Sequence, residues 1–143
     1  MDTDELFAAV ESLVKESGLL LVDMTAKNVG RTYHIRVLVD RPGRVTIDEC
    51  ASLSRRVKDS IDGEMLVMNE NYRLEVSSPG IGRPLSSEVD WIRSVGRTLS
   101  VELHDDSFTG ILEDYAEGRL RFQDDTEVST DEIVRAVEVI DNS

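Results

Sequence analysis

The sequence predicts an α+β protein of two domains, an N-terminal α-β-β-α-β domain over residues 1–83 and a small all-β domain over residues 84–143. In the first part, apolar residues recur with the spacing of a helix, two strands, a helix and a strand, in that order. The second part contains short apolar runs separated by Asp, Ser and Gly, which is typical of a small barrel. Between them, a dense run of Pro and Gly restrains the backbone.

A helix and a strand hairpin open the first domain. Asp2 or Thr3 is suited to cap the helix and Gly18 to end it. The apolar stripe of this helix consists of Leu6, Phe7, Val10, Leu13 and Val14. The short apolar run 19–24 predicts a buried strand, and a turn signal at residues 28–30 leads to a second strand that we expect to pair with it. That second strand alternates at Tyr33, Ile35, Val37 and Val39.

A second helix and a third strand complete the first domain. Residues 40–43 form a turn signal, Thr46 and Glu49 have the spacing of a capping box, and Gly63 is placed to stop the helix. Its inner stripe consists of Cys50, Leu53, Val57 and Ile61. The strand 72–77 alternates in the same way, and we expect both helices to pack on one face of the sheet. The order is loosely like that of RNA-binding KH folds, but no Gly-x-x-Gly spacing occurs, so a KH-type backbone clamp is not expected.

The segment 77–85, Ser-Ser-Pro-Gly-Ile-Gly-Arg-Pro-Leu, concentrates backbone restraints directly after this strand. Pro79 at the second position and Gly80 at the third predict a type II turn. Pro84 directs Arg83 away from helical angles and toward an extended conformation. We therefore expect a stiffened connector that holds out Arg83. The alternative is a hinge between two domains with no binding role.

The second domain opens with a short helix over residues 87–93, in which Trp91 is the packing anchor and which Gly96 ends. Five short strands are predicted after it, at residues 99–103, 108–115, 120–122, 126–128 and 134–140. Gly110 lies inside the second of these, where a long strand must bend to close a barrel. Residues 101–110 resemble the first motif of Sm-like or SH3-like barrels.

The chain is strongly acidic, and the charge is unevenly divided. Its formal net charge is −13. Residues 1–72 hold nine Lys/Arg and 13 Asp/Glu, a net charge of −4, whereas residues 73–143 hold seven and 16, a net charge of −9. The second half therefore repels a phosphate backbone and attracts a basic protein. The alternative is that the acidic surface only keeps the chain soluble.

The first domain holds the one notable basic cluster in the sequence. We take five of its members as candidate RNA contacts: Arg41, Arg44, Arg55, Arg56 and Lys58. Arg31 and Arg36 lie nearby in the sequence. The alternative is a solvated face on which these groups pair with Glu49, Asp59 and Asp62.

No common catalytic or metal-binding spacing occurs in the sequence. Cys50 is the single cysteine, which excludes an intramolecular disulfide, and on the apolar side of a helix a small buried thiol is common. His34 and His104 have no Ser or Cys partner nearby in the sequence, and we expect them at the surface. Three acidic pairs are interpreted as loop tips, because neighbours in a strand face opposite ways: 105–106, 113–114 and 124–125. We expect no enzyme activity, cofactor or metal.

The start of the chain, residues 1–5, is acidic and lacks the basic and apolar regions of a secretion signal. No apolar run approaches the about 20 residues that span a bilayer. We therefore expect a cytoplasmic protein without a membrane partner.

The connector motif Ser77-Ser78-Pro79-Gly80-Ile81-x-Arg83-Pro84-Leu85 closely resembles that of the RimP family, the bacterial ribosome maturation factors. Chain length, element order and the barrel-like second part also fit, so the resemblance spans nearly the whole chain. One position departs, because the residue before the arginine is often acidic in the family and is Gly82 here. Any contact that this acidic group makes in the family is absent from this chain.

The resemblance implies a non-catalytic assembly factor that binds the small (30S) ribosomal subunit and promotes its maturation. A basic small-subunit ribosomal protein near the decoding centre is the implied partner, ribosomal RNA is a further contact, and we expect a monomer. The candidate partner-binding residues are Ser78, Pro79, Gly80, Arg83, Pro84, Asp105 and Asp106.

Two other classes of function are weighed against this one. The first is an Sm-like RNA-binding module that acts directly on RNA. The charge of −9 in the second half and an aromatic content of 5% oppose it, because single-strand binders use positive grooves and stacking. The second is a small hydrolase that uses the acidic pairs.

Overall fold

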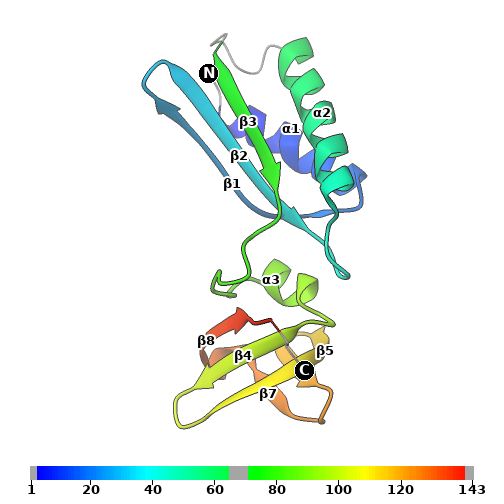
Figure 1. Cartoon of the computed structure of the whole chain (residues 1–143), viewed down its shortest axis with the longest axis vertical. Helices are drawn as coiled ribbons and strands as arrows, with labels where there is room; N and C mark the ends of the chain where they lie inside the picture. The colour runs from blue at the N-terminus through cyan, green and yellow to red at the C-terminus, as the bar shows by residue number, and fades with distance from the viewer. Residues whose placement is uncertain (1–2, 65–70, 141–143) are drawn as a thin grey trace. The chain divides into compact units, whose positions relative to one another are not determined.

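The computed structural model describes residues 3–64 and 71–140, and the chain forms two compact units, Met1–Pro79 and Gly80–Ser143 (Figure 1). Each unit has a hydrophobic core of its own. The predicted α+β class is confirmed, because an α-β-β-α-β region precedes an antiparallel sheet of five strands. We call them the first and the second unit.

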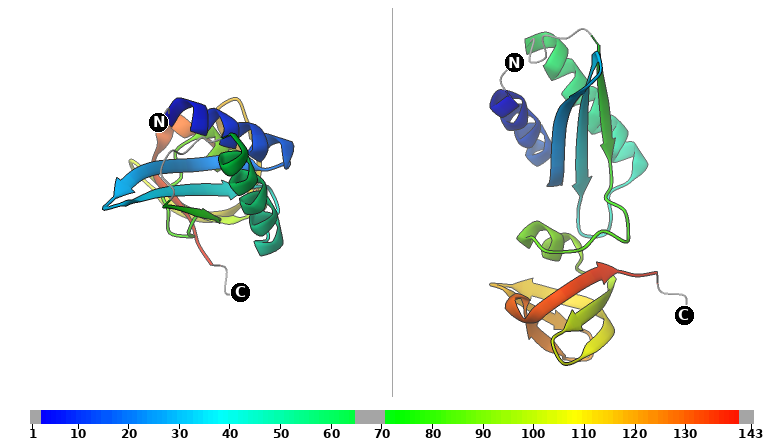
Figure 2. Two further views of the ribbon diagram at one scale, coloured as in Figure 1. Left: turned by 90° about the horizontal axis from the view of Figure 1, so that it is seen from above. Right: turned by 90° about the vertical axis from the view of Figure 1, so that its left-hand side faces the viewer.

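The first unit is a three-stranded sheet with two helices on one face (Figure 2). Its elements are α1 (Thr3–Glu16), β1 (Leu20–Val29), β2 (Thr32–Asp40), α2 (Ile47–Glu64) and β3 (Tyr72–Ser77). The strands lie in the order β1-β2-β3, with β1 antiparallel and β3 parallel to β2. The predicted hairpin of the first two strands is therefore confirmed. Both helices and the inward residues of β2 share one core, as alternation in a strand predicts.

Local sequence signals set the end of α1. Gly18 follows the helix with a φ of 75°, and the N–H of Leu19 donates to the carbonyl of Val14 at 3.1 Å. This backbone bond is part of a Schellman motif, which satisfies a carbonyl at the helix end and buries the apolar residue after the glycine. Of the two predicted N-caps, Thr3 is the first residue of α1, and Asp2 lies outside the described residues.

The predicted capping box starts α2. The N–H of Glu49 donates to Oγ1 of Thr46 at 3.1 Å, and the N–H of Thr46 donates to Oε1 of Glu49 at 2.9 Å. The bond from the Thr46 N–H is the largest cause that lowers the pKa of the Glu49 carboxyl. The inner stripe is buried as predicted: Cys50, Leu53, Val57 and Ile61. The helix runs one residue past Gly63, the predicted stop.

The first strand differs from its prediction in length and burial. We expected a short buried strand over residues 19–24, but β1 extends to Val29 and none of its residues is buried. The reason is its position at the edge of the sheet, where β2 is its one partner among the described residues. Pairing with β2 keeps the polar residues after Met24 in the strand, and one register shift lies between Leu21 and Asp23.

The predicted type II turn of the connector is wrong. Neither Gly80 nor Gly82 has the positive φ that a type II turn requires at its third position. The turn lies two residues further on, where the N–H of Arg83 donates to the carbonyl of Gly80 at 3.3 Å. Its central residues, Ile81 and Gly82, avoid the left-handed region, so glycine is not demanded by the backbone there.

The second unit consists of a short helix and five antiparallel strands, as predicted. Its elements are α3 (Glu88–Arg93), β4 (Thr98–Leu103), β5 (Ser107–Ala116), β6 (Arg119–Phe122), β7 (Glu127–Ser129), the 3-10 turn η1 (Thr130–Glu132) and β8 (Ile133–Glu138). The strand order is β7-β6-β5-β4-β8, which fits a barrel-like fold. Trp91 is 4% exposed and belongs to the core, so the predicted anchor is confirmed. The last strand ends at Glu138, two residues earlier than expected.

The strand β5 changes partner one residue after Gly110, where the sequence predicted a bend. Its first half, through Ile111, pairs with β4, and from Leu112 onward it pairs with β6. A Cβ added at Gly110 would lie 3.3 Å from Cδ1 of Phe122. The Phe122 ring is 1% exposed and packs edge to face on Phe108 with centroids 5.0 Å apart, so it has little room to move. The glycine therefore makes space for the Phe122 ring.

We predict that Gly110→Val destabilises the second unit by about 1–3 kcal/mol, the usual cost of overpacking a core. Urea unfolding followed by the fluorescence of Trp91, the single tryptophan, reports on this unit. The matched control is Thr109→Val, because Thr109 is the exposed neighbour in the same strand. Equal midpoints for the two variants would contradict the packing argument.

Candidate functional site

The connector, residues 77–85, is anchored at its far end to the second unit. The N–H of Leu85 donates to the carbonyl of Ala136 in β8 at 2.8 Å, and the Leu85 side chain is 5% exposed in the core. Arg83 lies two residues before this anchor and is half-buried. The position of Arg83 is therefore restrained by the turn before it and by the buried leucine after it.

A buried carboxylate holds the chain that follows the connector. Asp90 accepts the N–H groups of Ser86 at 2.9 Å and of Ser87 at 3.1 Å, and Nε of Arg93 at 3.1 Å. The Asp90 and Arg93 side chains are 6% and 4% exposed. Burial alone would raise the pKa of Asp90, but these N–H donors and the guanidinium together hold it below its usual value of 3.8. We did not predict this ion pair, although Ser87-x-x-Asp90 has the spacing of a capping box, which the structure forms.

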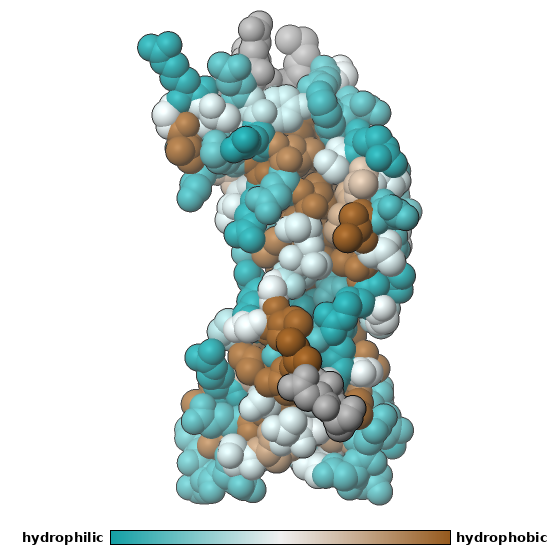
Figure 3. Space-filling model, in the orientation of Figure 1, coloured by the Kyte–Doolittle hydropathy of each residue, from teal (hydrophilic) through white to brown (hydrophobic). Residues whose placement is uncertain are grey.

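The candidate acidic residues Asp105 and Asp106 lie in the exposed turn between β4 and β5. The carbonyl of Asp106 accepts the N–H of Leu103 at 2.8 Å, and its carboxylate accepts the N–H of Ser107 at 2.8 Å. These bonds order the turn and leave both side chains at the surface. Hydrophilic residues cover much of the visible surface of the second unit (Figure 3).

The other acidic pairs divide between a turn and a strand. Asp124 and Asp125 lie in the turn between β6 and β7, as the loop-tip interpretation predicted. That interpretation is wrong for Glu113 and Asp114, which lie inside β5. Both residues lie in the strand predicted over residues 108–115, so pairing in the sheet overrides the turn character of two adjacent acids, and a register shift lies between Leu112 and Asp114.

Most of the predicted RNA-contacting residues on the first unit face carboxylates. Three of the five form ion pairs within this unit: Arg41 with Glu49 at 3.0 Å, Arg56 with Glu16 at 2.9 Å, and Lys58 with Asp62 at 2.9 Å. Arg44 and Arg55 are exposed. Glu49 and Asp62 are two of the partners that the alternative named, so at these positions the geometry resembles a solvated, paired surface. Their contact with RNA stays a prediction.

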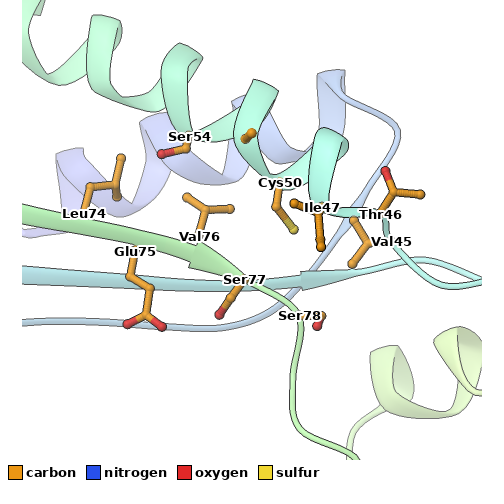
Figure 4. A pocket seen from close by; sticks show the side chains of 11 residues that line it. Val45, Thr46, Ile47, Cys50, Ser54, Leu74, Glu75, Val76, Ser77 and Ser78 are labelled. Carbon is orange, nitrogen blue, oxygen red and sulfur yellow. The ribbon is translucent and has the colours of Figure 1, made fainter.

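An open groove that sequence reasoning missed lies between the first half of α2 and β3 (Figure 4). Its volume is about 470 Å³. Leu74 and Val76 point from β3 toward the helix, and Ile47, which is 87% exposed, lies across from them. Ser78, a predicted partner-binding residue, lines the groove at the start of the connector. The apolar Ile47, outside the inner stripe of α2, is the signal in the sequence.

The described residues contain no group of three or more His, Cys, Asp or Glu side chains that could hold a metal ion. Cys50 is buried, and desolvation, with smaller effects from nearby carboxylates, raises the pKa of its thiol. The reactive thiolate is therefore disfavoured. Within residues 3–64 and 71–140, no helix combines the length and the apolar character that a membrane crossing requires.

The fold and these surfaces define an acidic α+β protein of two units, whose candidate sites are an anchored connector, a groove and charged patches. Residues 9–82 match the family model described as the RimP N-terminal domain. The chain is also similar to a protein named ribosome maturation factor RimP from Prosthecochloris aestuarii (strain DSM 271 / SK 413). The two are 39% identical over 120 residues, which cover 75% of this chain and 67% of the relative. The chain therefore belongs to the RimP family.

We predict that Asp90→Asn destabilises the second unit at pH 7 by about 3 kcal/mol, because it removes the negative charge that faces the buried guanidinium of Arg93. The folded pKa of Asp90 lies below 3.8, so its stabilising effect is present above that pH and is lost as pH falls through the folded pKa. Urea unfolding followed by Trp91 fluorescence, at pH 7 and at several values below 3.8, measures the difference. The control is Asp114→Asn, an exposed carboxylate of the same unit. A loss of stability that stays constant down to the lowest pH would contradict the charge argument.

Proposed function

We propose that this protein is a non-catalytic ribosome maturation factor that binds the small ribosomal subunit in the cytoplasm and promotes its maturation. Membership of the RimP family is the observation that carries the proposal, because a relative that is 39% identical is named a ribosome maturation factor. The surfaces support binding better than catalysis, since the single cysteine is buried and the described residues hold no metal cluster.

The partner that best fits the second unit is a basic ribosomal protein near the decoding centre. The net charge of −9 over residues 73–143 creates a negative potential that attracts and steers basic polypeptides. Asp105 and Asp106 present carboxylates in an ordered turn, so a partner lysine or arginine meets them with little further ordering of the backbone.

The connector supports a second contact through Arg83. Because Leu85 is fixed in the core and a hydrogen-bonded turn precedes Arg83, the guanidinium starts from a restrained backbone. A restrained arginine loses less conformational freedom on binding than one on a mobile loop. The exposed neighbours Ser78, Gly80 and Pro84 surround it in the sequence.

Co-sedimentation with immature small subunits tests the proposal. Wild-type protein should travel with the subunits through a sucrose gradient, and a strain without the gene should accumulate free small subunits and unprocessed ribosomal RNA. Absence of both effects would reject the proposed function. Tight gel-shift binding to naked ribosomal RNA, with no binding to intact subunits, would favour the Sm-like alternative.

We predict that Arg83→Ala weakens co-sedimentation about tenfold or more, because a hydrogen bond made by a charged group contributes about 1.5–3 kcal/mol. Arg135→Ala, which removes an exposed arginine from β8 of the same unit, should have little effect. The apparent Kd from a titration of subunits compares the two variants. Unchanged binding of Arg83→Ala would remove Arg83 from the candidate site.

We predict that replacing both turn carboxylates, in Asp105→Asn/Asp106→Asn, weakens binding to small subunits several-fold at low salt and much less at high salt. Salt screens exposed charges, so the affinity of the wild-type protein should also fall as ionic strength rises. Sedimentation at several salt concentrations measures both effects. Asp124→Asn/Asp125→Asn is the matched control, because it removes the same charge from another turn of this unit. Salt-insensitive binding of the wild-type protein would contradict the electrostatic contact.

A further inference from the structure

The sheet of the first unit brings three basic residues from distant parts of the sequence into one row. Lys27 in β1 lies opposite His34 in β2, and His34 lies beside Arg73 in β3. All three alternate with the core residues of their strands, so they point to the face opposite the two helices. Neighbouring strands are about 4.8 Å apart, which places the three side chains next to one another across the sheet.

The next row on the same face adds one arginine and one carboxylate. Thr25, Arg36 and Glu75 lie side by side in the same pairing register. Arg36 and Glu75 are 3.8 Å apart, and their side chains are 58% and 62% exposed, so the pair contributes little stability. The two rows line a shallow cavity of about 330 Å³. We call the six lining residues that point away from the helices the basic sheet face: Thr25, Lys27, His34, Arg36, Arg73 and Glu75.

Lys27 and Arg73 are exposed, and neither forms an ion pair with any carboxylate of the described residues. They differ in this respect from Arg41, Arg56 and Lys58, whose charges face carboxylates of their own unit. A phosphate that approaches the basic sheet face therefore meets cations without first displacing a protein carboxylate from those two groups.

We propose that the basic sheet face binds the backbone phosphates of single-stranded RNA. Phosphate binding is driven by cationic side chains that replace condensed counterions, and three permanent cations against one carboxylate supply that charge. No Phe, Tyr or Trp side chain lines the cavity, so the contact rests on the phosphate backbone, and binding is largely independent of sequence. The choice of RNA over an acidic peptide rests on the proposed function, which places the protein on the small ribosomal subunit, a particle that contains ribosomal RNA.

Fluorescence anisotropy with a fluorescein-labelled single-stranded RNA of about twelve mixed nucleotides, a length within the usual site sizes of single-strand binders, tests the proposal. Lys27→Ala/Arg73→Ala should weaken binding about tenfold or more. It should also reduce the slope of log K against log salt by about 1.4, because two phosphate contacts are lost. The variant Lys27→Arg/Arg73→Lys keeps both charges and should bind like the wild type. Lys15→Ala/Arg135→Ala removes the same charge from exposed sites elsewhere. It should leave the affinity within about twofold of the wild-type value and the salt slope unchanged.

Several results would overturn the proposal. They are no binding by the wild-type protein, equal losses in the test and control variants, or a poly-glutamate peptide that competes as well as unlabelled RNA. Thermal unfolding of each variant verifies that the fold is intact, which surface substitutions on an exposed face should preserve. Co-sedimentation with small subunits separates the two hypotheses. If the wild-type protein binds subunits and Lys27→Ala/Arg73→Ala binds RNA as tightly as the wild type, this inference alone is rejected. Failure of the wild-type protein to bind subunits rejects the proposed function.

Discussion

The connector end of the second unit depends on the hydrogen bonds and the ion pair that the buried carboxylate of Asp90 forms. Removing a carboxylate from water costs several kcal/mol, and only a set of well-placed donors offsets that cost. Here the donors are two backbone N–H groups and the Arg93 guanidinium, so the same bonds that neutralise the charge also order Ser86 and Ser87. Ordering these residues starts α3 and places Trp91 in the core. The restrained setting of Arg83 is therefore a consequence of packing inside one unit.

The cations of the first unit fall into two groups that differ in how they are paired with carboxylates. On α2 and the turn before it, arginine and lysine side chains lie beside carboxylates that helical spacing or the capping box brings close. Such pairs contribute little at an exposed surface, but they lower the local positive potential. On the sheet face opposite the helices, the strands place Lys27, His34 and Arg73 together with few acids. A basic sequence cluster and a basic surface are therefore different things in this protein.

Local signals were sufficient to predict most elements of this fold. Spacing predicted the stripe of α2 and the capping box of Thr46 and Glu49, because each depends on residues a few positions apart in one helix. The prediction of a type II turn was wrong, because a glycine permits a positive φ without requiring it. The predicted length of β1 was wrong, because pairing with β2 overrides the polar composition of the outer half of the strand. The basic sheet face could not be predicted from local spacing, because Arg73 joins it through parallel pairing with a strand almost forty residues earlier.

The protein carries an acidic surface on the second unit and the basic sheet face on the first. A partner that contains both RNA and basic protein can contact both surfaces. Each unit has its own core, so a substitution on one surface need not disturb the other. Added salt, however, weakens both contacts in the same direction, because it screens attraction to phosphates and attraction to lysine or arginine alike. Salt dependence alone therefore cannot identify which surface carries the affinity. Variants that remove equal charge from one unit at a time are needed to separate them, and the net charge of −13 makes such matched changes essential.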